Sequence, residues 1–182
     1  MAISERKKQP FKVLHRIALE KAREIHESPI EKLYSIDEYG DCYYAEGDAE
    51  KVRPTQAMME REVISIHNHP HKQKLSSSFS GEDIFSLMDS PHIQEIIVCG
   101  YGVYYWMKRG TCVLDAETIY KLVDDMGWRV ANTEYNKAPP GISRKAFKRW
   151  VNKREPIFLE NYHKELLKLT KEIGLSYGRS KL

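Results

Sequence analysis

The sequence contains few cysteines and no long apolar segment. Only three of its 182 residues are cysteines, and none of the three lies in a C-x-x-C pair. A disulfide framework and a thiolate zinc site are therefore both disfavoured, and a reducing compartment is favoured. No apolar stretch approaches the roughly 20 residues that a spanning helix needs, and the basic N-terminus has no signal-peptide core behind it. We expect a cytoplasmic protein with no membrane association.

The chain also lacks a strong excess of charge of either sign. Lys and Arg number 29 and Asp and Glu number 26, so the formal net charge is +3. An excess of this size does not by itself indicate nucleic acid binding. With 41% apolar residues, the chain is long enough for one domain with a hydrophobic core and an appendage.

Patterns typical of helices and of strands alternate over the first part of the chain. Apolar residues recur at helical spacing over 10–27 and stop before Pro29, which predicts an amphipathic helix. Shorter patterns typical of strand pairs, of a buried strand and of one further helix follow at 32–45, 63–66, 80–88 and 93–107. This alternation predicts a layered α/β domain.

From residue 115 onward the pattern is helical and basic. Helices are expected over 115–126 and 143–174, with a proline-containing linker between them, and Pro156 should kink or divide the second helix. The last letters, YGRSKL, are expected to be loose. The chain is thus divided into an N-terminal helix that packs on the core, an α/β domain and a helical, basic C-terminal extension, at 1–27, 28–114 and 115–182.

The tetrapeptide HNHP, residues 67–70, directly follows an apolar run. Residues two apart in a strand share a face, so the side chains of His67 and His69 can converge, and Pro70 ends the strand pairing. Two polar residues in a surface turn are the alternative. A third ligand must come from another segment, and Asp83 is well placed at the expected helix start. Two His and one carboxylate are typical of a catalytic zinc, which lowers the pKa of its bound water to about 7.

The letters His67-Asn68-His69-Pro70, followed by Ser80-Gly81-Glu82-Asp83, resemble the JAB/MPN (JAMM) metalloprotein signature H-x-H-P…S-x-x-D. They are especially similar to the RadC-like branch and to JAB domains of phage and mobile-element proteins. The resemblance covers about residues 28 to 110 and implies that family's fold, a cytidine-deaminase-like mixed sheet flanked by helices. It also implies one zinc ion per chain, held by His67, His69 and Asp83, with Ser80 steadying the oxyanion or the metal-bound water.

The resemblance further implies a glutamate as general base, just before the first strand of the domain. Glu31 matches that place best, and Glu27 is the alternative. The spacing between the second His and the Ser is longer than is usual in the family. We therefore expect an insertion within His71–Phe79, because at the shorter spacing Ser77 and Ser80 would take the Ser and Asp places, and a hydroxyl is a poor zinc ligand.

Three functions are compatible with these expectations. The first is a zinc-dependent hydrolase of metallopeptidase or isopeptidase type, acting on a peptide or protein substrate. The second is a non-catalytic or DNA-associated RadC-like module, whose basic C-terminal helices bind nucleic acid or another acidic partner. The third is a metal-dependent nuclease with the same ligands. The basic residues in question lie beside Trp150 and are Lys145, Lys148, Arg149, Lys153 and Arg154, and a solvated face explains them more simply. The sequence indicates neither the substrate nor the oligomeric state.

Overall fold

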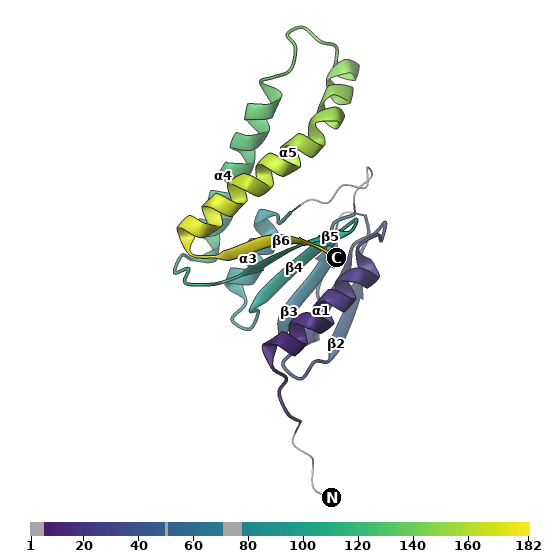
Figure 1. Ribbon diagram of the computed structural model, residues 1–182, viewed down its shortest axis with the longest axis vertical. Helices are drawn as coiled ribbons and strands as arrows, with labels where there is room; N and C mark the ends of the chain where they lie inside the picture. The colour runs from purple at the N-terminus through teal and green to yellow at the C-terminus, as the bar shows by residue number, and fades with distance from the viewer. Residues whose placement is uncertain (1–5, 50, 71–77) are drawn as a thin grey trace, which may run out of the picture.

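A sheet with helices on both faces forms the body of the protein (Figure 1). The computed structural model describes residues 6–49, 51–70 and 78–182. The helices are α1 (Phe11–Ile25), α2 (Gln56–Met59), α3 (Gly81–Asp89), α4 (Ala116–Tyr135) and α5 (Arg144–Ile173). The strands are β1 (Lys32–Asp37), β2 (Cys42–Glu46), β3 (Glu62–Asn68), β4 (Glu95–Gly100), β5 (Val103–Lys108) and β6 (Ser176–Lys181).

The six strands form one mixed sheet in the order β2-β1-β3-β4-β5-β6. Strands β3 and β4 are parallel, and all other neighbours are antiparallel. A parallel pair needs a crossover connection, and the segment that carries α3 provides it. The expected α/β class, with a mixed sheet flanked by helices, is therefore confirmed.

Both faces of the central strands are buried. On one face, α1 packs against the sheet through the side chains of Leu14, Ala18, Ala22 and Ile25. On the other face, α3, α4 and α5 meet the sheet through a second cluster, which includes Ile84, Leu87, Ile96, Val98, Ile119, Val123 and Leu166. Burial on both faces explains why β4 reads as a nearly continuous apolar run in the sequence.

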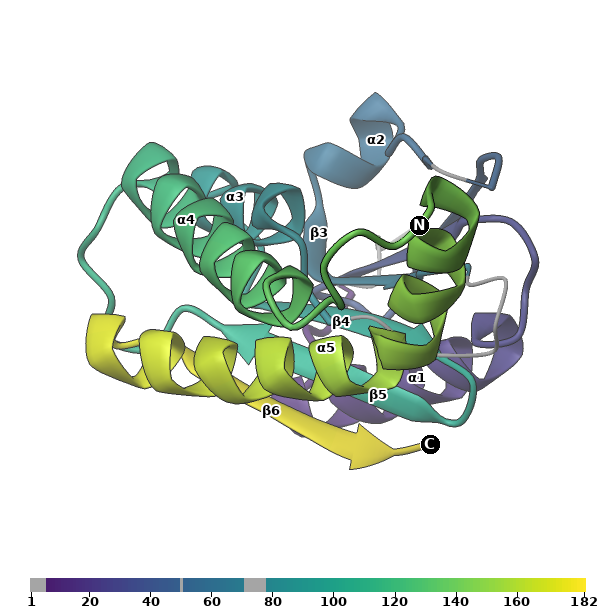
Figure 2. The same ribbon diagram turned by 90° about the horizontal axis from the view of Figure 1, so that it is seen from above.

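Helices α4 and α5 form a long hairpin that extends beyond the sheet (Figures 1 and 2). Helix α4 continues to Tyr135, farther than expected, and α5 is one helix that contains Pro156, so the proline does not divide it. The ribbon of α5 changes direction between its two halves (Figure 2), as an internal proline favours. None of the described helices is long and apolar enough to cross a membrane.

The C-terminal segment forms strand β6, so the expectation that YGRSKL is loose is wrong. Gly174 ends α5 with a left-handed φ of 80° and lets the chain turn back to the sheet. Tyr177 is buried in the core, and Gly178 packs so closely on Trp106 that a Cβ there would lie 2.7 Å from the ring. The other residues of β6 are polar and exposed, because β6 is an edge strand. A single buried residue in a polar segment cannot be distinguished from a polar tail in the sequence.

Candidate metal centre

Two imidazoles converge where β3 ends. His67 is held in the sheet on both sides, opposite Leu33 of β1 and Val98 of β4. His69 lies beyond the last strand residue, but its backbone N–H still donates to the carbonyl of Cys99 over 3.2 Å. The chain between them therefore stays extended and ordered, and the two side chains lie on one face of β3 as the spacing predicted.

A capping box at the start of α3 orients the third side chain. The hydroxyl and the backbone N–H of Ser80 both donate to Oδ2 of Asp83, each over 2.7 Å. In return the N–H of Asp83 donates to the Ser80 hydroxyl over 3.2 Å, which completes the reciprocal cap. The carboxylate is thus fixed by its own helix, and its Oδ1 atom faces His67 at 2.9 Å from Nε2.

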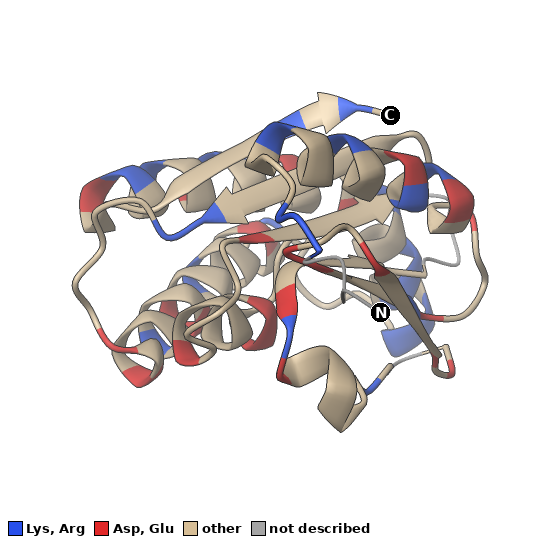
Figure 3. Ribbon diagram, turned by 90° about the horizontal axis from the view of Figure 1, so that it is seen from below, with Lys and Arg blue, Asp and Glu red and all other residues tan. Residues whose placement is uncertain are grey.

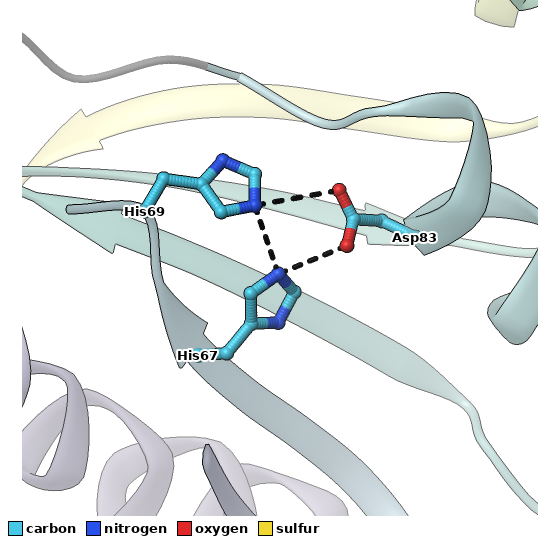
Figure 4. Close-up of side chains that lie close together, drawn as sticks. All are labelled: His67, His69 and Asp83. Atoms are coloured by element: carbon cyan, nitrogen blue, oxygen red, sulfur yellow. Dashed lines mark hydrogen bonds and ion pairs between the residues drawn. The ribbon is translucent and has the colours of Figure 1, made fainter. Parts of the chain in front are cut away.

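The three side chains present their donor atoms to a common point (Figure 4). The Nε2 atoms of His67 and His69 lie 3.1 Å apart, and Nε2 of His69 lies 3.6 Å from Oδ2 of Asp83. Zinc bonds of about 2.0–2.1 Å at tetrahedral angles separate two donor atoms by about 3.3 Å. The distances within this group, His67, His69 and Asp83, therefore fit a zinc ion with three protein ligands.

Burial and charge act in opposite directions on these groups. Burial lowers the pKa of His67, but the negative charge of Asp83 and then that of Glu31 outweigh it and raise the pKa. Burial raises the pKa of Asp83, but the positive charges of His67 and His69 hold it well below its ordinary range. Asp83 is therefore ionised at neutral pH, which is the form that binds a cation.

Glu31 lies beside this group without belonging to it. It directly precedes β1, and its carboxylate accepts a hydrogen bond from the N–H of Val52 over 2.8 Å. Burial raises the pKa of the Glu31 carboxyl, and the charge of His67 opposes this. A half-buried carboxylate with a raised pKa next to a metal group suits proton transfer. Glu27, the alternative, is exposed in the turn that follows α1 and does not line the cavity described below.

Asn68, between the two histidines, holds the Glu31 segment in place. Its side chain is fully buried on the opposite side of the strand. Its Oδ1 accepts from the N–H of Lys32 over 2.8 Å, and its Nδ2 donates to the carbonyls of Ile30 and Ser28 over 3.0 and 3.2 Å. The sequence predicted that Asn68 points away from the two imidazoles, but it gave no sign of these hydrogen bonds.

A cavity of about 650 Å³ contains the whole group. All five side chains proposed from the sequence line it, namely Glu31, His67, His69, Ser80 and Asp83. Glu62, Tyr120 and Asp124 also line it, and the sequence did not single them out. Glu62 could have been found in the sequence, because it is a charged residue directly before an apolar run that predicts a buried strand. Tyr120 and Asp124 are four residues apart on one face of α4, but nothing in the sequence places that face against α3.

The C-terminal segment holds the two residues that precede the α3 cap. Tyr162 of α5 donates its hydroxyl to the carbonyl of Phe79 over 2.9 Å. The hydroxyl of Tyr177 in β6 lies 2.6 Å from that of Ser78 and 2.6 Å from Nδ1 of His163. Residues 71–77, which carry most of the expected insertion, lie outside the described residues. Of the expected insertion, the structure describes Ser78 and Phe79, which are held by contacts with β6 and α5.

Comparisons of the chain with models of protein families, with curated proteins and with solved structures find no match.

Proposed function

We propose that the protein is a zinc-dependent hydrolase of the JAB/MPN type that cleaves an amide or isopeptide bond in a peptide or protein substrate. One observation carries this proposal. His67, His69 and Asp83 form a group of metal-binding geometry, and the carboxylate of Glu31 lines the same cavity without being part of that group. Hydrolysis by a metal-activated water requires both features, a ligand set and a separate proton acceptor.

Each side chain has a distinct part in this proposal. A bound zinc ion would supply a Lewis acid and lower the pKa of a coordinated water. Glu31 takes up a proton at its carboxylate and returns it to the leaving nitrogen, a role for which a raised pKa is suited. Ser80 directs both its N–H and its hydroxyl to Asp83 and so fixes the ligand. A contact from Ser80 to the developing oxyanion would require its hydroxyl to turn away from Asp83, because a hydroxyl has only one hydrogen to donate.

Metal analysis of the purified protein tests the ligand set. We expect about one zinc per chain in the wild type and little in the His67→Ala, His69→Ala double variant. The wild-type amount is expected in His92→Ala, because His92 is exposed and does not line the cavity. Zinc content that survives the double variant would exclude this site.

Hydrolysis of a mixed peptide library, followed by mass spectrometry, tests the base. We expect Glu31→Gln to retain zinc and to lose cleavage by a factor of about 10² or more, as is usual for a general base. Glu27→Gln is the matched control, since the same change is made at an exposed residue outside the cavity. Equal losses in both variants, or none in Glu31→Gln, would remove Glu31 from this role.

A second candidate function is nucleic acid binding by the first half of α5. Acidic and basic residues are interspersed over most of the ribbon (Figure 3), but residues 144–154 carry six basic residues and no acidic one. Residues 143–149 are all exposed, including Phe147, whose ring stacks on Trp150. Basic side chains with an accessible aromatic ring favour a single-stranded nucleic acid.

Fluorescence anisotropy with a labelled single-stranded oligonucleotide tests this second function. We expect binding that weakens steeply between 50 and 200 mM salt, as phosphate contacts require (~10-fold or more). The Lys148→Glu, Arg149→Glu variant should lose it, whereas Lys168→Glu at the other end of α5 should not. Binding must also persist in Glu31→Gln, because it does not depend on the cavity.

A further inference from the structure

We infer that the end of the cavity formed by Glu62 is a subsite for a cationic side chain, lysine or arginine, of the substrate. This inference rests on the proposed hydrolase function and names the substrate class that the cavity selects. It starts from one buried side chain. Glu62 is the first residue of β3, it is 5% exposed, and it lines the same cavity as the metal group.

The Glu62 carboxylate is held by neutral partners. The hydroxyl of Ser35 on the neighbouring strand donates to its Oε2 over 2.5 Å, and the side chain of Ser65 gives a further hydrogen bond. Burial raises the pKa of this carboxyl, and the hydroxyl groups together with the more distant charge of His67 oppose the rise. Among the described residues, no Lys or Arg forms an ion pair with Glu62.

Two other glutamates are buried in the described part of the chain, and both are paired with a cation. Glu95 lies 3.4 Å from the ammonium of Lys108 and also contacts His15. Glu134 accepts from Arg154 over 2.6 Å and from Lys137 over 2.5 Å. Buried carboxylates are normally paired with a cation, because removing the charge from water is costly. Glu62 is also buried but has no Lys or Arg partner among the described residues. Because it lines a cavity, a cationic group of a ligand can form that ion pair.

The walls between the metal group and Glu62 are suited to an alkyl chain. Leu33, Ile93 and Ile96 line the cavity, with Ser65 on β3 between His67 and Glu62. Glu62 and His67 are five residue steps apart along β3, or about 16 Å at about 3.3 Å per step. An extended lysine or arginine side chain covers part of that length. The cationic residue would therefore lie within about two residues of the cleaved bond.

The overall charge of the cavity favours the same ligand. Among the described residues, five carboxylates line it, namely Glu31, Glu62, Glu82, Asp83 and Asp124, against two basic residues, Lys51 and Arg53. One divalent zinc ion would leave an excess of negative charge. Such a cleft concentrates cations and repels acidic peptides. Recognition of an acidic group through Lys51 and Arg53 is the competing possibility, and the experiment below separates the two.

Binding of amino acid amides to the metal-free protein, followed by NMR titration, tests the subsite without catalysis. The probes are the N-acetyl amides of lysine, arginine, norleucine and glutamate; norleucine has a neutral alkyl chain of lysine-like length. We expect the lysine and arginine probes to bind at least about fivefold more tightly than norleucine in the wild type, as expected for a desolvated charge pair. In Glu62→Gln, this ratio should fall to near one.

Glu60→Gln is the matched control, because Glu60 is an exposed carboxylate two residues before Glu62 that does not line the cavity, so it should leave the ratio unchanged. Contacts between the lysine probe and the methyl groups of Leu33 and Ile96 in wild-type NOE spectra give a second measurement, independent of whether Glu62→Gln folds. Equal binding of norleucine and lysine, preference for the glutamate probe, or absence of those contacts would overturn the subsite.

The outcomes also separate this inference from the hydrolase proposal. A chain that binds the lysine probe selectively but no zinc would retain the cationic subsite and lose the hydrolase. A chain that binds zinc at His67, His69 and Asp83 but shows no selectivity for the lysine probe would lose the subsite and retain the hydrolase. Peptides cleaved by the zinc-loaded wild type should contain Lys or Arg within about two residues of the cut, and Glu62→Gln should cleave them without this preference.

Discussion

The side chain of Asn68 accepts a hydrogen bond from the backbone N–H of Lys32 over 2.8 Å. The same side chain donates to the carbonyl of Ile30 over 3.0 Å, so both neighbours of Glu31 are bound to the residue between the two histidines. The proposed base and the proposed ligands therefore cannot move independently. This coupling depends on no metal ion and can be tested in the apoprotein.

Replacing Asn68 with Ala should destabilise the protein and displace Glu31. The substitution removes the hydrogen bonds of Asn68 to the N–H of Lys32 and to the carbonyl of Ser28, and it leaves the carbonyl of Ile30 with the Ser28 hydroxyl alone. A loss of about 2–3 kcal/mol in the free energy of unfolding is expected for buried groups of this kind. Urea denaturation measures it. Asn132→Ala, at an exposed position of α4, is the control and should change stability little.

Replacing Tyr162 with Phe should weaken the metal site from a distance. The change removes only the hydroxyl that donates to the carbonyl of Phe79, next to the α3 cap. We expect a loss of about 1 kcal/mol in stability and a weaker zinc affinity, because supporting contacts commonly change metal affinity about tenfold. A zinc competition titration with a chromophoric chelator measures the affinity. Tyr135→Phe, an exposed tyrosine of α4, should leave it unchanged, and equal affinities in all three proteins would contradict this coupling.

The strand-end histidines and the capped acid could be read from the sequence because each depends on local structure. His67 and His69 follow from strand periodicity, and Asp83 follows from a capping box whose partners are three residues apart. Long-range pairing had no comparable local signal. The hydrogen bonds of Asn68 to the Glu31 segment join residues more than 30 positions apart, and no sequence pattern within either segment predicts them.

The C-terminal part of the chain was the least predictable for the same reason. Its helices were expected, but their role depends on which faces meet α3 and the sheet. Tyr177 lies in a polar hexapeptide and becomes buried only because β6 pairs with β5. In the sequence, Tyr162 cannot be distinguished from the other apolar residues of a basic helix. Only the structure shows that its hydroxyl donates to the carbonyl of Phe79. Such contacts are set by tertiary packing, which overrides local propensity.

Zinc should stabilise the folded protein through the three ligands. A ligand that binds the native state at a free concentration of about 100 times its Kd adds about 2.7 kcal/mol to the free energy of unfolding. We expect this gain in the wild type and its loss in Asp83→Asn, which keeps the size of the side chain but removes the charge that pairs with His67. Chemical denaturation with and without zinc measures it. Asp89→Asn, at the exposed end of the same helix, should retain the gain; an equal gain in both variants would place the metal elsewhere.

Glu134 should make the α4–α5 hairpin sensitive to acid. The hydrogen bonds and charges of Lys137 and Arg154 hold the pKa of the Glu134 carboxyl below its ordinary value of 4.5. Because the folded-state pKa is lowered, the stabilisation is fully present above about pH 4.5 and is lost as the pH falls through the folded-state pKa.

Replacing Glu134 with Gln should therefore lower stability at pH 7 by about 2 kcal/mol, the scale of hydrogen bonds to a charged group. The difference between wild type and variant should shrink toward zero as the pH falls below 4.5, and thermal unfolding from pH 3 to pH 7 measures it. Glu165→Gln is the control, since Glu165 is half-buried and its one ion pair within the described residues is with Lys168, one turn along the helix. A difference that stays constant with pH would mean that Glu134 supports the hairpin by its shape, and not by its charge.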